Sequence, residues 1–163
     1  MKITSEIVQE AIRIAEPTVF EIVKTSLSKG KTGVSVVVMF GHLKGRGINR
    51  TKPELKMAAT IGSSEIKYDE FAMRKANLSW RTGSDCDEIT KNFYHSLILE
   101  EGTDTPYAGS NVLNVGDLRL VVATSALKER EDQAISILLL TIIMMLVNRK
   151  VIVAELPGAN GVI

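Results

Sequence analysis

The feature that most restricts how this chain can fold is an uncharged apolar run from Ala134 to Val147, AISILLLTIIMMLV. It is shorter than the roughly 20 apolar residues that a bilayer-spanning helix needs. Apolar side chains would occupy nearly every side of a helix formed by this run, so the helix needs packing partners on more than one side. The run therefore predicts a long helix, beginning after Lys128 and ending near Asn148, that lies in a protein core or a subunit interface.

The composition is that of a chain able to build such a core. Of its 163 residues, 45% are hydrophobic and 24% charged, which fits one globular domain over residues 1–163 and not a disordered segment. The 20 basic and 19 acidic residues leave a formal net charge of +1, so no net field draws the chain toward nucleic acid or an anionic membrane. We therefore expect one domain, with no nucleic acid and no membrane among its partners.

Cysteine usage and the N-terminal residues bear on the compartment. The single cysteine, Cys86, has no partner for an intrachain disulfide or for a thiolate zinc site, which suits a reducing environment. The first residues, MKITSEIVQEAIRIAE, are amphipathic and acidic by Glu6, unlike a signal or transit peptide. The sequence thus favours a cytoplasmic location.

Hydrophobic spacing predicts the order of the elements. A helix begins at Thr4 or Ser5 and is kinked or divided at Pro17, because proline has no amide proton to donate inside a helix. The further elements are a strand over 34–40, a return strand over 55–61, a helix over 68–80, and a hairpin of strands over 111–115 and 118–124. Since no β-α-β alternation recurs, we expect an α/β fold of the α+β type, with a central, mostly antiparallel sheet of about five strands. The N-terminal and final helices are expected to cover its two faces.

Three short blocks occur along the chain in a characteristic order. Val34 to Leu43 reads VSVVVMFGHL, a strand that ends in a Gly-His-Leu turn. Phe71 to Ala76 reads FAMRKA, a helix with a basic pair followed by alanine, and Ala123 to Gln133 reads ATSALKEREDQ, a strand that runs through a serine into an acidic helix start. In this order the blocks resemble the GlcG/HbpS-like (haem-degrading-domain-like) family, and they also resemble its uncharacterised bacterial and yeast sister family. The resemblance spans most of residues 5–148.

The resemblance implies a profilin-like three-layer architecture, a homo-oligomer and, from the haem-binding members, a site for haem or another tetrapyrrole. Carried over to this sequence, it implies cofactor contacts from His42, Arg74, Lys75 and Ser125, with no catalytic residue and no resident metal. The implied function is a non-catalytic small-ligand-binding domain. The alternative is an oligomeric structural or partner-binding protein that keeps the fold without ligand chemistry, and a third class is an enzyme acting on a tetrapyrrole or a small organic acid.

The sequence departs from the family pattern at three places. Met39-Phe40 stands where the family usually has an aspartate before the glycine turn, and Tyr107-Ala108-Gly109-Ser110 lacks the family's histidine. The family's Val-Ser-Gly becomes Thr124-Ser125-Ala126. These losses indicate that the fold is kept while the ligand chemistry is altered or absent.

Other patterns of catalytic chemistry are poorly supported. Gly30-Lys31-Thr32 ends like a P-loop, but Thr25 stands where the first glycine belongs, and the expected helix precedes the segment instead of following it. Only His42 and His95 are available to activate a nucleophile or bind zinc, and neither lies in an HExxH pattern. We interpret His95 as a partly buried packing residue.

His42 is the leading candidate for a ligand contact, because it ends the most clearly predicted strand and a neutral imidazole can bind haem iron. Its alternative interpretation is a solvent-facing turn residue. Basic side chains could converge on a small anionic ligand through paired oxygens, or could simply be solvated. They are Lys44, Arg46, Arg50, Arg74, Lys75 and Arg81.

We expect any ligand to bind where the Gly-His-Leu turn, the basic loop over 41–53 and the helix face with Arg74 and Lys75 approach one another. Neighbouring helix residues point about 100° apart, so only one of the two basic residues faces the site. Lys75 is favoured, because the family pattern ends in Lys-Ala. Asp132 is interpreted as one of the acidic residues that favour a helix N-terminus.

Overall fold

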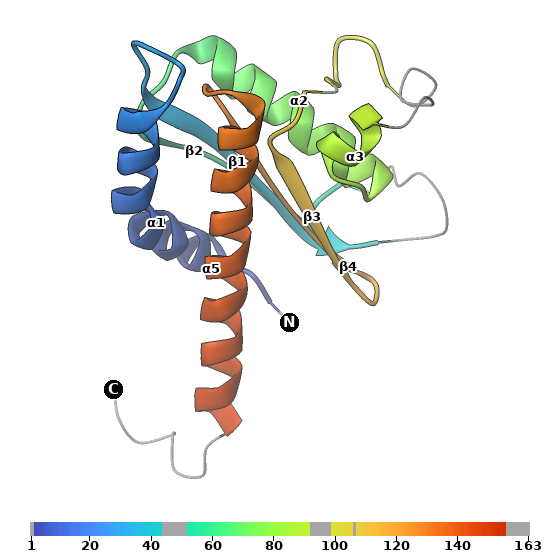
Figure 1. Cartoon of the computed structure of the whole chain (residues 1–163). Coiled ribbons are helices and arrows are strands. Elements are labelled where there is room, and N and C mark those ends of the chain that lie inside the picture. The colour runs from blue at the N-terminus through green and yellow to red at the C-terminus, as the bar shows by residue number, and fades with distance from the viewer. Residues whose placement is uncertain (1, 44–51, 92–98, 106, 156–163) are drawn as a thin grey trace.

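The computed structural model describes residues 2–43, 52–91, 99–105 and 107–155, without the side chains of residues 90 and 150–155. The helices are α1 (Ser5–Thr25), α2 (Ile66–Thr82), α3 (Cys86–Lys91) and α5 (Glu129–Glu155). The strands are β1 (Thr32–His42), β2 (Leu55–Ser63), β3 (Ser110–Val115) and β4 (Leu118–Ser125). Figure 1 shows α1 and α5 side by side in front of the sheet, with α2 on the far side of it.

The sheet consists of two hairpins joined along one central seam. Its strand order is β2-β1-β4-β3, and every neighbouring pair is antiparallel. In the seam Ser35 pairs with Ser125 at one end, and His42 pairs with Leu118 at the other. The antiparallel α+β architecture is therefore confirmed. The expected fifth strand is not confirmed, because the described residues form four strands. In the described part of the segment between α2 and β3 the regular element is the short helix α3.

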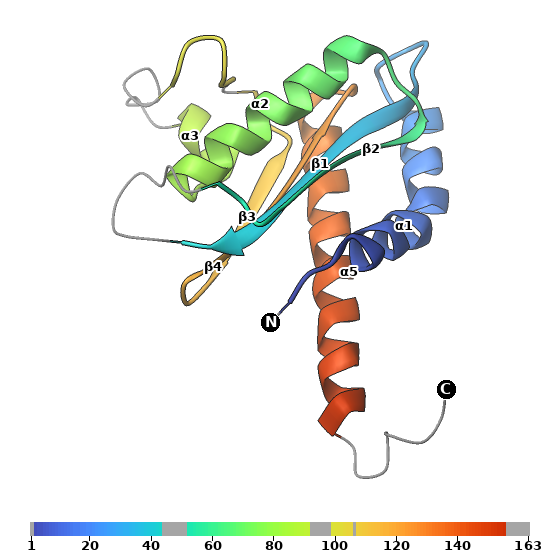
Figure 2. The ribbon, with the colours of Figure 1, turned by 180° about the vertical axis from the view of Figure 1, so that it is seen from behind.

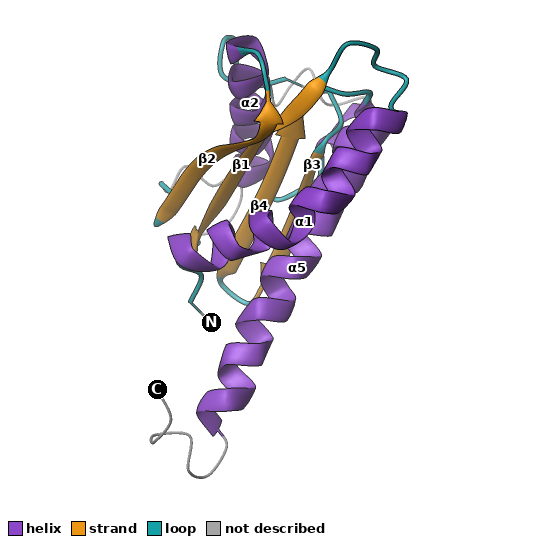
Figure 3. Ribbon diagram, turned by 90° about the vertical axis from the view of Figure 1, so that its left-hand side faces the viewer, coloured by secondary structure: helices purple, strands orange, loops and turns teal. Residues whose placement is uncertain are grey.

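Both faces of β1 are covered, which explains its run of β-branched residues. Val34, Val36 and Val38 pack into the core beneath α1 and α5, whereas Val37 and Met39 pack toward α2. Figures 2 and 3 show the resulting layers, with α2 on one face of the sheet and the α1/α5 pair on the other. The expectation of helices on both faces is confirmed. The assignment of α1 and α5 to opposite faces is wrong, because both present apolar stripes to the same core.

Helix α1 contains Pro17 without ending there. Figures 1 and 3 show a single helix that bends partway along its length. Proline removes the amide that would donate one turn back and its ring crowds that carbonyl, so a bend is the expected response. The alternative of two separate helices is not observed. Ala11, Ala15 and Val19 are buried along the inner side of the bend.

Helix α5 begins at Glu129, as expected, and continues past Asn148 to Glu155. No glycine or proline stands before Pro157 to stop it earlier. Figure 1 shows its C-terminal half projecting beyond the sheet. A buried stripe repeats every fourth residue, whereas the outer side carries exposed apolar residues, among them Ile137 and Met145. The buried stripe comprises Ile135, Leu139, Ile143 and Val147.

One helix among the described residues, over Glu129–Arg149, is long and apolar enough to cross a membrane by length and composition. A third of that apolar window is buried in the protein. A core helix of a soluble protein meets the same two criteria, so length and composition do not distinguish a membrane-spanning helix from a core helix. In this fold the helix packs on β4, β3 and α1.

Candidate functional site

A lysine is buried between α2 and the sheet. The side chain of Lys75 is only 3% exposed, and its ammonium donates to the backbone oxygen of Thr124 and to Oδ2 of Asp132, each at 2.9 Å. Lys75 lies on the apolar side of α2 with Ala72 and Ala76, which brings it against the end of β4. Burying an ammonium without a counter-charge costs a large amount of free energy, so the contact with Asp132 stabilises Lys75 in this buried position.

Asp132 reaches Lys75 from the first turn of α5. Its Oδ1 accepts a hydrogen bond from the amide of Leu127 at 3.1 Å, and its carboxylate is 3% exposed. Burial raises the pKa of Asp132 to about 6, although the charge and hydrogen bond of Lys75 act in the opposite direction. The interpretation as a helix-start acid fits the neighbouring Glu131, whose carboxylate accepts from the amide of Lys128. Asp132 instead turns inward.

Gly109 completes the surroundings of the ion pair. Its φ is +122°, and its carbonyl oxygen accepts a hydrogen bond from the amide of Thr124 at 2.7 Å. A Cβ at this position would lie 2.7 Å from Cβ of Asp132 and 2.8 Å from Nζ of Lys75. The missing side chain therefore leaves the room that the lysine and aspartate occupy.

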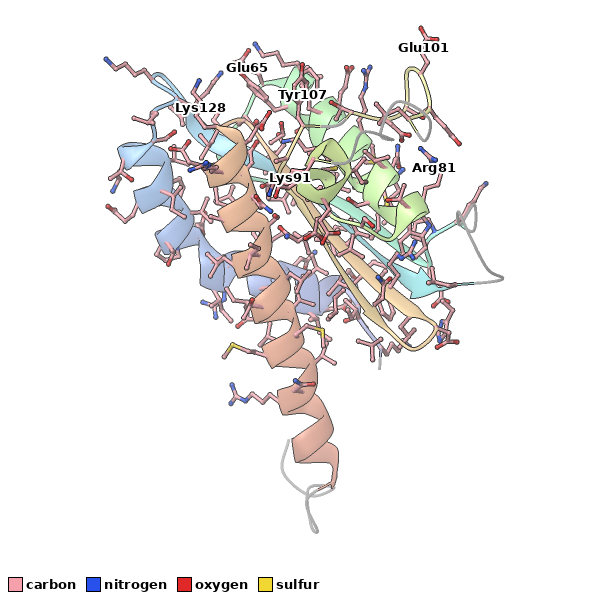
Figure 4. All side chains as sticks on the ribbon, turned by 45° about the vertical axis from the view of Figure 1, so that its right-hand side comes forward. Glu65, Arg81, Lys91, Glu101, Tyr107 and Lys128 are labelled. Atoms are coloured by element: carbon pink, nitrogen blue, oxygen red, sulfur yellow. The ribbon has the colours of Figure 1, made fainter. Side chains whose placement is uncertain are left out.

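A cavity of about 240 Å³ opens above this ion pair. Phe71 and Tyr107 meet on its wall in an edge-to-face contact, with ring centroids 6.3 Å apart. Figure 4 labels Tyr107 and Lys128, which lie at the same end of the molecule as the start of α5. The cavity is thus apolar and aromatic on one side and charged on the other. Its lining comprises Tyr68, Phe71, Lys75, Tyr107, Ser125, Ala126, Leu127, Lys128, Glu129 and Asp132.

The ammonium of Lys75 has hydrogen-bonding capacity left over. A lysine ammonium carries three donors. Within the part of the chain that the structure describes, Lys75 uses two of them, on Thr124 and Asp132. Because Lys75 also lines the cavity, the third donor is available to an acceptor oxygen inside it. A ligand oxygen or a water is expected there, since a buried donor left unsatisfied costs free energy.

Ala126 has the backbone conformation of a glycine. Its φ is +147°, and no other non-glycine residue described has a positive φ. The resemblance places a family glycine at this position, so the chain keeps the backbone turn but lacks the residue that adopts it without strain. Strained φ values of this kind cost on the order of 1–3 kcal/mol.

Ala126→Gly is accordingly expected to raise the free energy of unfolding by about 1 kcal/mol, the relief of strain exceeding the greater freedom of glycine in the unfolded chain. Urea denaturation measures the change. The control is Ala58→Gly on the exposed side of β2, where glycine is expected to lower stability by about 0.5–1 kcal/mol. Loss of stability in both variants would show that Ala126 is not strained.

The predicted site residues divide between two ends of the sheet. Lys75 and Ser125 both line the cavity, whereas Arg74 is half-buried and is not among the lining residues. His42 lies seven residues along β1 from the partner of Ser125, a separation of about 23 Å at the usual rise per residue. Its Nδ1 contacts Oε1 of Glu54 at 2.6 Å, and its side chain is 49% exposed. The expectation that His42 and Lys75 meet in one site is therefore wrong.

The expected basic patch is not assembled from the described residues. Arg81 is held by Glu100 at 3.5 Å and by Asp104, and it lies at the opposite end of α2 from the cavity. A larger cavity of about 390 Å³ lies beside it, but the Arg81 side chain on its wall already has these two acidic partners. The remaining residues named for the patch or for packing, Lys44, Arg46, Arg50 and His95, lie outside the described residues.

Sequence reasoning missed the partner of Lys75, Asp132, and the role of Gly109. The sequence did contain one signal of the ion pair. Lys75 interrupts a buried stripe of small residues on α2, which comprises Ala72, Ala76 and Ser79. A charge in such a stripe requires an opposite charge from another element. The distance of 57 residues to Asp132 leaves no local pattern that would identify that partner.

This three-layer α+β fold is also found in solved structures of other proteins. No protein-family model and no curated protein matches this sequence. The PduOC:heme complex matches with a TM-score of 0.60 at 12% identity, covering 87% of this chain and 95% of that chain. A double mutant of HbpS from Streptomyces reticuli matches with a TM-score of 0.57 at 18% identity, covering 87% of each chain.

A third match extends to the sister family. The yeast protein Ybr137w matches with a TM-score of 0.58 at 13% identity, covering 88% of this chain and 79% of that chain. The resemblance to the GlcG/HbpS-like family and its sister family is thus confirmed for the fold.

Proposed function

We propose that this chain is a small-ligand-binding domain, and that its ligand is a planar organic molecule held with an acceptor oxygen on Lys75. The observation that carries the proposal is a buried Lys75 ammonium that lines a cavity with Phe71 and Tyr107 and uses only two of its three donors on described residues. Ligand cavities typically combine apolar and aromatic walls with a few fixed polar groups. Lys128 and Glu129 also line the cavity and balance each other in formal charge, so the ligand is selected by its acceptor oxygen and its ring and not by net charge.

Haem is the first ligand to test, because the PduOC neighbour is a heme complex and the resemblance implies a tetrapyrrole. The cavity fits only part of such a molecule. Its volume of about 240 Å³ lies below the roughly 300–1,000 Å³ of sites that enclose drug-sized ligands. Its described lining contains no histidine, cysteine or methionine, and tyrosine is the only usual iron ligand there. These residues fit a carboxylate-bearing ring better than a whole haem.

The test compares benzoate, followed by calorimetry, with haem, followed by absorbance. Benzoate is expected to bind the wild-type protein, and Tyr107→Ala is expected to weaken binding about tenfold by removing one aromatic wall. Tyr107 is 54% exposed, so its removal leaves the core intact. Lys75→Met is expected to abolish benzoate binding, with circular dichroism checking that the variant is folded.

The matched control is His42→Ala at the other end of the sheet, which is expected to leave benzoate binding unchanged. Haem binding that is lost in His42→Ala but unchanged in Tyr107→Ala would place the tetrapyrrole at His42 and contradict the cavity as its site. If neither benzoate nor haem bound the wild-type protein, the proposed ligand-binding function would be contradicted.

The exposed apolar side of α5 supports a second function, an oligomeric partner-binding role. Ile137 is 47% exposed and Met145 is 65% exposed, on a helix that projects past the sheet (Figure 1). Large apolar side chains exposed on one side of a helix commonly mark an interface. This role and ligand binding do not exclude each other, because the cavity lies at the other end of α5.

Light scattering at micromolar concentration is expected to give a mass of at least two chains. The double variant Ile137→Lys/Met145→Lys is expected to shift that mass to one chain, because two charges would have to be buried in the interface. Thr141→Lys, on the same exposed side of the helix, tests whether the contact includes the middle of α5. A wild-type mass of one chain would contradict the proposal.

A further inference from the structure

We propose that Lys75 forms a reversible imine with an aromatic aldehyde bound in the cavity. This inference rests on the proposed ligand site and adds a covalent step to it. The chemistry follows from three features of the same site: a buried lysine that lines a cavity, a carboxylate 2.9 Å from its ammonium, and aromatic walls. A lysine amine held in an apolar pocket is a recurrent nucleophile toward carbonyl carbon.

The direction of Lys75 suits attack on a carbonyl group. Two of its donors are fixed by Thr124 and Asp132, so the ammonium nitrogen has a defined place at the base of the cavity. Lys75 is among the residues that line the cavity, so a carbonyl group in the cavity would approach the ammonium from that side. A hydrogen bond from the third donor to the aldehyde oxygen is the non-covalent complex that precedes reaction.

Asp132 is placed to move the protons of the reaction. Its carboxylate accepts one proton from the Lys75 ammonium, which frees the electron pair of the amine. The raised pKa of Asp132 makes its carboxylate a stronger base than an exposed aspartate. The amine then forms a bond to the carbonyl carbon, and the oxygen, taking up the protons released, leaves as water. The balance is ammonium plus aldehyde giving protonated imine plus water, with no oxidant or reductant.

The charge of the site is the same before and after the reaction. The ammonium and the protonated imine each carry one positive charge, so the carboxylate of Asp132 serves as counter-ion to both. No additional charge has to be buried, which would be the main cost of reaction at such a site. The imine nitrogen keeps a single N–H, so the hydrogen bond to Thr124 is given up. Water adds back to the protonated imine and releases the ammonium and the aldehyde, so the adduct is reversible.

The walls select the class of aldehyde. Phe71, Tyr107 and Tyr68 line the cavity, and aromatic rings prefer offset or edge-to-face contact with other rings. A volume of about 240 Å³ suits a ligand of one ring better than a large one. Lys128 stands at the mouth of the same cavity and is exposed, so it provides an internal comparison for lysine reactivity.

The experiment incubates the full chain with benzaldehyde and cyanoborohydride, which reduces an imine to a stable secondary amine. Peptide mass spectrometry then follows labelling at each lysine with time. Lys75 is expected to be labelled at least ten times faster than Lys128, and benzoate is expected to suppress labelling of Lys75 alone. Lys75→Arg is expected to lose the fast label while keeping the slow labelling of exposed lysines, such as Lys67.

The outcomes separate the two proposals. Labelling of Lys75 no faster than that of Lys128, in a protein that binds benzoate by calorimetry, would reject the imine and leave the ligand site standing. Slow labelling together with no benzoate binding would reject both. Fast labelling of Lys75 that benzoate does not suppress would show attack from outside the cavity and would also overturn the inference.

Discussion

Gly109→Ala is expected to lower the free energy of unfolding by about 3–5 kcal/mol. The added Cβ would lie 2.7 Å from Cβ of Asp132 and 2.8 Å from both Nζ of Lys75 and the carbonyl oxygen of Thr124. All three groups are buried and bonded to one another, so they cannot move aside without losing hydrogen bonds. The φ of +122° adds strain for any residue with a side chain.

Gly102→Ala is the matched control. Gly102 also has a positive φ, +76°, but a Cβ there would meet no atom within 4 Å. Its substitution therefore measures backbone strain alone, which is expected to cost about 1–2 kcal/mol. Urea denaturation of both variants gives the comparison, and equal losses would mean that Gly109 is needed for its backbone conformation and not for the space beside Lys75.

The second large effect is a pH-dependent difference in the free energy of unfolding between two variants of the buried ion pair of Lys75 and Asp132. Lys75→Met leaves Asp132 without its cation, whereas Lys75→Met/Asp132→Asn also replaces the carboxyl group by an uncharged one of the same shape. At pH 7 the double variant is expected to be more stable than the single variant by about 3–4 kcal/mol. At pH 4 the difference is expected to fall close to zero, because Asp132 is then protonated in the folded state.

The sign follows from the raised pKa of Asp132. Its pKa is about 6 in the folded protein, against 3.8 ordinarily, with burial as the main cause. Between these values the folded state holds more protons than the unfolded state, so the free energy of unfolding falls as the pH rises. The charge and the hydrogen bond of Lys75 lower the pKa of Asp132, so this pKa rises further when Lys75 is replaced. The free energy of unfolding then continues to fall up to a higher pH. Urea denaturation from pH 4 to 7 measures it.

Lys67→Met, on the same helix, is the control for loss of a lysine. Its ammonium pairs with Glu65, and both side chains are 56% exposed, so the change is expected to stay within about 0.5 kcal/mol at neutral pH. If the free energies of unfolding of Lys75→Met and Lys75→Met/Asp132→Asn differed by the same amount from pH 4 to pH 7, Asp132 would not change its protonation in this range.

The fold was predictable wherever local patterns decide it. The β-branched run of β1, the hairpin around Gly116 and the start of α5 each follow from spacing and turn residues close in sequence. The expected fifth strand is not found among the described residues, where the segment before β3 contains turn residues and the short helix α3. The face that each helix covers was not predictable, since it depends on how two separate hairpins come together.

The candidate site was predictable only in part, for a related reason. Lys75 and Ser125 were identified through family resemblance, and both line the cavity. His42 was placed with them because the order of blocks along the sequence does not reveal their order along a strand. The antiparallel register of β1 and β4 puts His42 beside Leu118, at the far end from Ser125. Asp132 was missed, because its inward direction depends on Lys75, 57 residues away.

The seam between the two hairpins has a consequence for the folding rate. Each hairpin joins strands that are close in sequence, whereas the seam pairs Ser35 with Ser125 and His42 with Leu118, at sequence separations of 90 and 76 residues. Closing so long a loop costs chain entropy before any seam contact forms, so proteins built on distant pairings fold slowly. We therefore expect formation of the seam to set the folding time, with the cavity beside Ser125 formed only after that step.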